Sequence, residues 1–101
     1  MTTYRQTPSP HGNGTLYLAG ASMPPPKMVK PANGTTFELD ELYAMIGCKY
    51  VEMLELGGGL IAIFDEEGRN KQLLQNFHVY VGYNQLLLFG AVLVCPSDMF
   101  D

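Results

Sequence analysis

Glycines at two places divide the middle of the chain into short segments that differ in their pattern of apolar and polar residues. Gly47 follows an amphipathic segment, residues 38–46, and Gly57-Gly58-Gly59 separates the alternating residues 48–56 from the largely apolar residues 60–65. Glycine enters the left-handed backbone conformation at little steric cost, so it ends helices and turns hairpins. We therefore predict a helix, a strand, a tight turn and a second strand, with the two strands paired antiparallel.

The helix prediction rests on the spacing of its apolar residues. Leu39, Leu42 and Ile46 recur at the i, i+3 and i+7 positions that share one helical face. Thr35 and Glu38 have the spacing of a capping box at the start of a helix. A helix this short must be held by packing of its apolar face, because intrinsic propensity alone does not stabilise it.

The rest of the chain is assigned to strands and one further helix. Residues 15–20 predict a weak first strand, and residues 27–31 predict an edge strand because Pro31 cannot donate to a ladder. A second short helix is expected to begin near Asn76. Residues 86–94 are nearly all apolar and predict a single strand covered on both faces. The fold class is therefore α+β, a small antiparallel or mixed sheet with one or two short helices.

Length and charge restrict the class of protein. The 101 residues fit a flexible N-terminal tail, residues 1–14, and a single α+β domain, residues 15–101. The net charge of −4 and the lack of a basic run disfavour a nucleic-acid partner. The first residues carry no apolar signal segment, and the longest apolar run is about half of a membrane span. We expect a cytoplasmic protein with no membrane partner.

The residue types that often act in metal binding, phosphate binding or catalysis lack the spacing and partners that such sites need. Cys48 and Cys95 lack the short paired spacings of a metal site, and they fit buried apolar positions better than a disulfide. The three glycines precede a strand, whereas a phosphate loop precedes a helix. The acidic residues 65–67 fit a solvated turn better than a cation site. Cys48 and His78 lack a third orienting group. We predict no metal, no cofactor and no catalytic residue.

One strand position favours a binding site. Glu52 is the odd member of the more apolar face of residues 48–56, and a carboxylate among apolar neighbours must be paired or titrate upward. We therefore expect Glu52 to be at least partly buried. Aromatic and amide side chains follow later in the chain, a mixture that suits a small planar ligand or a partner protein but also fits ordinary core and surface. The predicted ligand- or partner-binding residues are Tyr50, Glu52, Asn76, Tyr80 and Tyr83.

Several short motifs between residues 36 and 96 occur in a familiar order. They are Leu39-Asp40-Glu41-Leu42 with Ile46-Gly47, Tyr50-Val51-Glu52, Asp65-Glu66-Glu67-Gly68, Asn76, and Phe89-Gly90-Ala91-Val92. In this order they resemble domain of unknown function 3846, a family of short proteins of phages, plasmids and bacteria. The chain has Cys48, Asp65 and Ala91 where the family pattern has Gly, Asn and Asp. The resemblance implies a phage or mobile-element setting and implies no reaction.

These observations lead to one functional prediction with two alternatives. We expect a non-catalytic phage or mobile-element protein that binds a host protein or a small metabolite, with antagonism of a host or defence process as its role. The alternatives are a small enzyme that uses Glu52 as general acid or base, and a nucleic-acid accessory protein. A homo-oligomer, most simply a two-fold dimer, is also expected, because so small a domain rarely covers both faces of an apolar strand such as residues 86–94.

Overall fold

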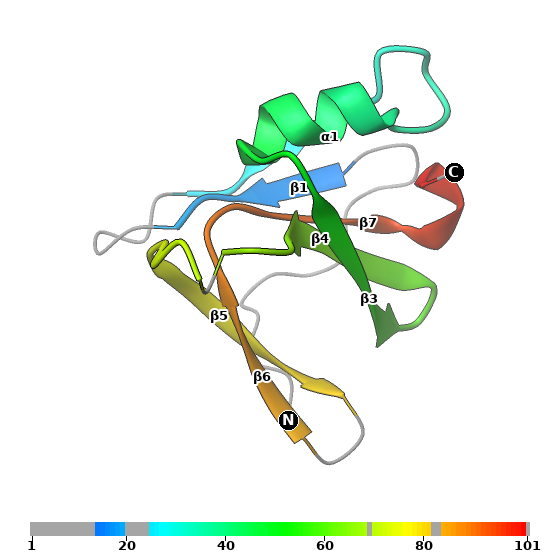
Figure 1. Ribbon diagram of the computed structural model, residues 1–101. Helices are drawn as coiled ribbons and strands as arrows, with labels where there is room; N and C mark the ends of the chain where they lie inside the picture. The colour runs from blue at the N-terminus through cyan, green and yellow to red at the C-terminus, as the bar shows by residue number, and fades with distance from the viewer. Residues whose placement is uncertain (1–13, 20–24, 69, 82–83, 101) are drawn as a thin grey trace.

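Alternating apolar residues on two central strands bury both faces of an antiparallel sheet. In β4 (Leu60–Asp65), Ile61 and Ile63 face one core cluster, whereas Ala62 and Phe64 face the other. The neighbouring β7 (Val92–Pro96) alternates in the same way. Because both faces of these strands are apolar, each face needs its own covering layer. The computed structural model in Figure 1 describes residues 14–19, 25–68, 70–81 and 84–100.

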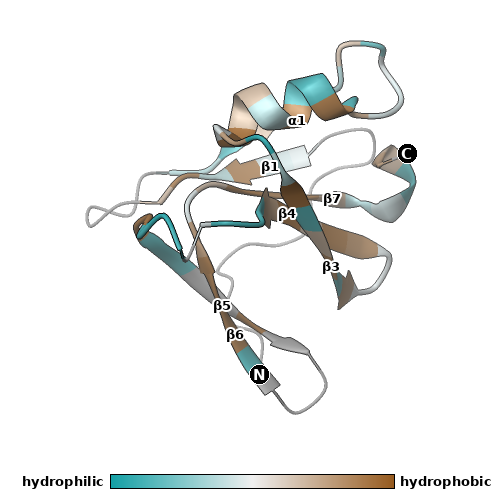
Figure 2. Ribbon diagram, in the orientation of Figure 1, coloured by the Kyte–Doolittle hydropathy of each residue, from teal (hydrophilic) through white to brown (hydrophobic). Residues whose placement is uncertain are grey.

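The layers are a helix, a five-stranded sheet and a two-stranded sheet (Figure 1). The helix α1 (Leu39–Ile46) inserts Leu42 and Ile46 into the first cluster, and β5–β6 inserts Val79 and Leu88 into the second. Figure 2 shows the apolar residues of β4 and β7 in the middle of this arrangement. The five-stranded sheet has the order β2-β1-β7-β4-β3, with every neighbouring pair antiparallel. The other strands are β1 (Gly14–Tyr17), β2 (Lys27–Val29), β3 (Val51–Gly57), β5 (Gln75–Val81) and β6 (Asn84–Phe89). This architecture confirms the predicted α+β fold.

The spacing of apolar residues and Gly47 predict the helix correctly, but its N-cap differs from the prediction. Gly47 ends α1 with φ 81° and donates its N–H to the Tyr43 carbonyl at 2.8 Å, as the glycine predicted. The predicted capping box of Thr35 and Glu38 is wrong, because Glu38 itself is the N-cap residue and the Glu41 carboxylate accepts its N–H at 2.9 Å. Thr35 instead donates its N–H to Asn33 Oδ1, in the turn before the helix.

The apolar face of α1 is narrower than its spacing predicted. Leu42 and Ile46 are buried, but Leu39 is 47% exposed. Leu39 is the first residue of the helix, so it lies at the end of the layer rather than over the sheet.

The predicted hairpin is confirmed, with β3 paired antiparallel to β4. Gly57, Gly58 and Gly59 have φ values of 91°, 65° and 79° at the turn. Only glycine adopts this series without strain, so the three glycines set the length of both strands.

Two predictions for the C-terminal half are wrong. Residues 75–81 form β5 rather than a helix, because their β-branched and aromatic residues find a pairing partner in β6. Residues 86–94 are not one strand. Gly90, with φ 79°, breaks the apolar run so that β6 joins the two-stranded sheet and β7 joins the five-stranded sheet. Residues of the same chain cover both faces of β7, which removes the reason for expecting a homo-oligomer.

The N-terminal predictions agree in part. The predicted strand at residues 15–20 is observed as β1, and the predicted edge strand at residues 27–31 is observed as β2 at the edge of the sheet. Most of the predicted tail lies outside the described residues, and its last residue, Gly14, is the first residue of β1.

Candidate functional site

The structure describes the side chains of three of the five predicted site residues, Tyr50, Glu52 and Asn76. Asn76 lies in β5, and its side-chain amide donates to two main-chain carbonyls, that of Tyr17 at 2.9 Å and that of Gly90 at 2.8 Å. It thereby ties β5 to the end of β1 and to the bend between β6 and β7. The side-chain N–H groups of Asn76 therefore serve the fold. The side chain of Tyr80 and the whole of Tyr83 lie outside the described residues.

Tyr50 and Glu52 do lie together, but on the surface. Tyr50 is 58% exposed, and Glu52 is also exposed. The expectation that Glu52 is partly buried is therefore wrong. The physical reason is the position of β3 at the edge of the five-stranded sheet, where only one neighbouring strand flanks it. The enzymatic alternative loses the buried carboxylate on which it rested.

The free side of β3 presents unpaired main-chain groups. Glu66 donates its N–H to the Tyr50 carbonyl at 3.1 Å, so the pairing of β3 with β4 begins as a hydrogen-bonded pair at Tyr50. In an antiparallel ladder hydrogen-bonded and non-hydrogen-bonded pairs alternate along the strand. Val51, Met53 and Glu55 therefore direct their N–H and C=O groups away from β4. Within the described part of the chain, no strand pairs with this side of β3.

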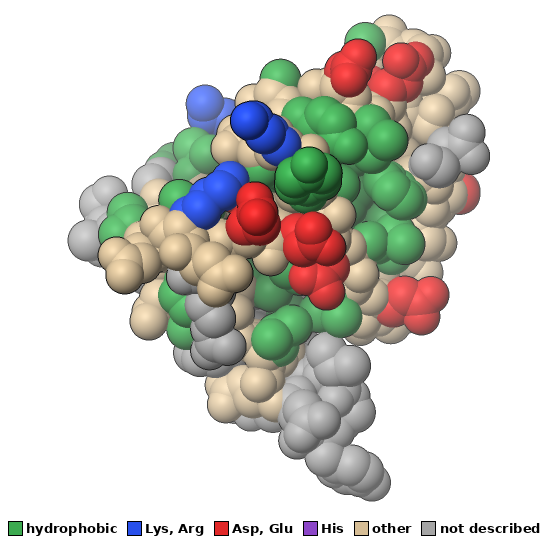
Figure 3. Space-filling model, in the orientation of Figure 1, with side chains coloured by type: hydrophobic (Ala, Val, Ile, Leu, Met, Phe, Trp, Pro, Cys, Tyr) green, Lys and Arg blue, Asp and Glu red, His purple; other side chains and the backbone are tan. Residues whose placement is uncertain are grey.

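A groove lies beside this edge, on the face covered by β5–β6. Its volume is about 190 Å³, and β3, β4, the turn after β4, and β6 form its walls. Leu86, which is 37% exposed, contributes to its apolar part. Figure 3 shows acidic and apolar side chains next to one another near the centre of this side of the molecule. The groove residues are Glu52, Phe64, Asp65, Glu66, Leu86, Leu87, Leu88 and Phe89.

The three carboxylates of the groove differ in their partners. Asp65 is only 3% exposed, pairs with Lys71 Nζ at 2.8 Å and accepts the N–H of Glu67 at 2.8 Å. The prediction of a solvated acidic turn is therefore wrong at Asp65, which anchors the loop after β4. Glu52 and Glu66 are exposed and, among the described residues, have no ion pair. The rim of the groove thus carries the negative charges of Glu52 and Glu66.

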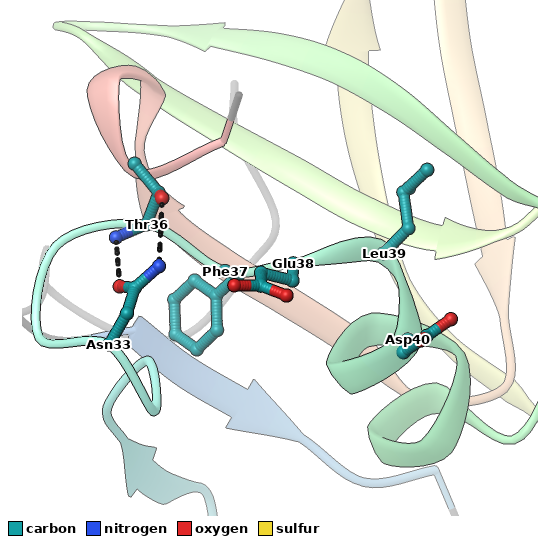
Figure 4. A pocket seen from close by; sticks show the side chains of 6 residues that line it. All are labelled: Asn33, Thr36, Phe37, Glu38, Leu39 and Asp40. Atoms are coloured by element: carbon teal, nitrogen blue, oxygen red, sulfur yellow. Dashed lines mark hydrogen bonds between the residues drawn. The ribbon is translucent and has the colours of Figure 1, made fainter.

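A second depression lies on α1's side of the molecule. It has a volume of about 470 Å³ and lies where the chain enters α1. Figure 4 shows that the Asn33 side chain, on its wall, turns toward Thr36 and takes part in two hydrogen bonds with it. Asn33 Oδ1 accepts the N–H of Thr36 at 2.9 Å. The polar groups of the Asn33 side chain therefore hold the turn before the helix instead of facing a ligand.

Burial favours the protonated form of both cysteine thiols. Burial raises the pKa of the Cys95 thiol to about 12, and burial is also the largest cause that raises the pKa of Cys48. A protonated thiol is a weak nucleophile at neutral pH. Both cysteines are free, in agreement with the sequence, although Cys48 is only partly buried. The described residues contain no cluster of His, Cys, Asp and Glu that could hold a metal ion.

Sequence reasoning missed Glu66 and β6 as parts of the candidate site. One signal was present for the edge position of β3, because Glu52 and Glu55 lie on opposite faces of this strand. A central strand of a covered sheet rarely carries a charge on each face, whereas an edge strand often does.

No family model, curated protein or solved structure matches the chain. The resemblance to domain of unknown function 3846 therefore stays a prediction. In the described part of the chain, no helix is long and apolar enough to cross a membrane.

Proposed function

We propose that this chain is a non-catalytic binding module of a phage or mobile element, and that it binds an extended segment of a host protein along β3 in the host cytoplasm. The observation that carries the proposal is the open edge of β3. An extended segment gains main-chain hydrogen bonds by adding a strand to such an edge, and its alternate side chains meet the surface on each side.

The side chains of β3 support a partner strand. Met53 is 45% exposed on one face, and Tyr50 is exposed beside the other. Natural edge strands are usually short, bulged or covered, because an open edge attracts other chains. β3 has seven residues, and its register with β4 is regular from Val51 to Glu55. A regular edge of this length accommodates a partner strand without rearrangement.

A protein segment fits the site better than a small metabolite does. Pockets for small molecules usually have volumes of about 300–1,000 Å³. The groove beside β3 has about 190 Å³, which is closer to the volume of a single side chain. The setting in a phage or mobile element rests on the resemblance alone.

Proline at position 53 tests the pairing. The Met53 N–H points away from β4, so Met53→Pro removes a donor from the free edge while it leaves the β3–β4 ladder intact. Met53→Ala is the matched control, since it removes the same side chain and keeps the N–H. Peptides selected from a random phage-displayed library on the wild-type protein serve as the probe. We expect them to bind Met53→Pro about ten-fold more weakly than Met53→Ala, because one main-chain hydrogen bond is lost and its acceptor is left unpaired.

Amide hydrogen exchange gives a second readout. Bound peptide should protect the N–H groups of Val51, Met53 and Glu55, whereas those of Glu52 and Leu54 are already protected in the free protein. Equal affinity for the two variants of Met53, or a selection that yields no binder, would contradict the proposal. A melting curve shows whether Met53→Pro remains folded. Protection of the same amides by a second copy, at rising protein concentration, would instead identify β3 as a self-association edge.

A further inference from the structure

The groove beside β3 joins an apolar floor to a negatively charged rim. Leu86 and its neighbours in β6 form the apolar part, and Glu52 and Glu66 carry the charge. We propose that this groove binds a cationic side chain, Arg or Lys, of the segment that pairs with β3. This inference rests on the proposed function, since it names the chemistry of the segment that β3 binds.

The strand geometry brings such a side chain to the groove. Glu52 pairs with Phe64 in β4, so its side chain lies on the same sheet face as Phe64, which is the face covered by β5–β6. A residue of an added strand directly opposite Glu52 would place its side chain on that face too. Opposite residues of neighbouring strands have their Cβ atoms about 4.5–5.5 Å apart. Their charged ends therefore meet at the mouth of the groove.

Arg and Lys match both parts of the groove. Each has an aliphatic stem that packs on apolar surface while its charged end stays near water. The stem would lie along Leu86, and the charged end would meet the carboxylates of Glu52 and Glu66. Tyr50 is exposed next to this mouth, across from Glu66 in the ladder, and an aromatic face also attracts a cation. Arg suits the site best, because its planar guanidinium binds carboxylates through two hydrogen bonds and stacks on aromatic rings.

The charge balance favours a basic partner over a second copy. Among the described residues, no Lys or Arg lines the groove, and the nearby Lys71 is held by Asp65. A second copy paired along β3 would bring its own Glu52 and Glu55 to the same edge. Like charges across an interface oppose association, whereas opposite charges favour the correct partner and speed the encounter.

Parallel peptide selections test the inference. A random phage-displayed library is selected on the wild-type protein and on Glu52→Gln, Glu66→Gln and Glu55→Gln. The last variant is the matched control, since Glu55 lies on the same strand with its side chain on the opposite face. All three residues are exposed, so the variants should fold as the wild type does. We expect Arg and Lys to be enriched at one position of the peptides selected on the wild type and on Glu55→Gln, and to be less enriched on the other two variants.

Binding constants then isolate the charge. The tightest wild-type peptide is synthesised with Arg and with citrulline, its uncharged isostere, at the enriched position. The citrulline peptide should bind the wild type about ten-fold more weakly, and the Arg peptide should bind Glu52→Gln and Glu66→Gln about three-fold to five-fold more weakly, at the upper end of exposed ion pairs. The preference for Arg over citrulline should shrink at about 1 M salt, because exposed charges are then screened beyond about 3 Å.

The possible results separate this inference from the proposed function. If selected peptides are sensitive to Met53→Pro but show no enrichment of Arg or Lys, β3 is a binding edge and the cationic groove is refuted. If the citrulline penalty persists unchanged in both Gln variants, the groove is also refuted. If the peptides ignore Met53→Pro and yet the citrulline penalty depends on Glu52 and Glu66, the groove is supported and pairing along β3 is refuted.

Discussion

The side-chain amide of Asn76 should contribute strongly to the stability of the fold. Its amide donates hydrogen bonds of 2.9 Å and 2.8 Å to the carbonyls of Tyr17 and Gly90, and all these groups are partly buried. A neutral hydrogen bond contributes about 0.5–1.5 kcal/mol net, and an acceptor left unpaired adds to the loss. Asn76→Ala should therefore lower the free energy of unfolding by about 2–3 kcal/mol.

Urea denaturation measures this change. With an m-value of about 1.5 kcal/mol/M, the midpoint should fall by about 1.3–2 M. Asn70→Ala is the control, because Asn70 is exposed and the same truncation there should change stability by less than about 0.5 kcal/mol. Equal midpoints for the two variants would refute the structural role of Asn76.

A second variant separates the donor from the shape of the side chain. Asn76→Asp keeps nearly the same shape but, when ionised at neutral pH, offers no donor to the two carbonyls. It should be at least as unstable as Asn76→Ala. A stable Asn76→Asp protein would show that the donated hydrogen bonds are not what holds β5 in place.

Backbone conformation and pH give the remaining tests, each read from urea midpoints. Gly47→Ala should lower the free energy of unfolding by about 1 kcal/mol, because φ is 81° there and the added methyl group meets no other atom. Gly90→Ala should lower it further, since φ is 79° and the methyl carbon would lie 2.7 Å from Leu73 Cδ1. The reverse order of the two losses would contradict the strain argument. The N–H groups of Glu38 and, to a lesser extent, Ala32 hold the pKa of Glu41 below its ordinary value of 4.5. Because the folded pKa is the lower one, the ionised Glu41 stabilises the fold above pH 4.5 and this contribution is lost as pH falls through the folded pKa. The stability difference between wild type and Glu41→Gln should thus be constant from pH 7 to about 5.5 and shrink in more acidic solution, whereas a constant difference down to pH 2 would be contrary to this assignment.

The parts of the fold that the sequence predicted well are those set by neighbours along the chain. Gly47 and the three glycines at 57–59 act on their own backbone, so the end of α1 and the β3–β4 turn follow from local conformation. The secondary structure of residues 75–81 and 86–94 depends on which strands they pair with. Gly90 stands in an apolar run, and only the different partners of β6 and β7 show that the chain bends there.

The candidate site was predicted less well for a related reason. The pattern of β3 suggested a covered face around Glu52, but burial depends on the order of strands in the sheet. The order β2-β1-β7-β4-β3 leaves β3 with one neighbour among the described strands. The alternation of apolar and polar residues within β3 does not predict this order. Tyr50 and Glu52 therefore lie beside the free edge of β3 and not in a covered face. Asn76 was chosen for its amide, which the fold uses.

In the proposed function, the carboxylates of β3 would have two roles that reinforce each other. Charged residues on an edge strand protect it from pairing with a copy of itself, because like charges then meet across the new ladder. Glu52 and Glu55 place one such charge on each face of β3. The same charges would attract the proposed strand that carries Arg or Lys, so repulsion of the wrong partner and attraction of the right one would add to a single difference in affinity. Met53 and Tyr50 are exposed between and beside the carboxylates, and they would supply the apolar contact area that charge alone does not.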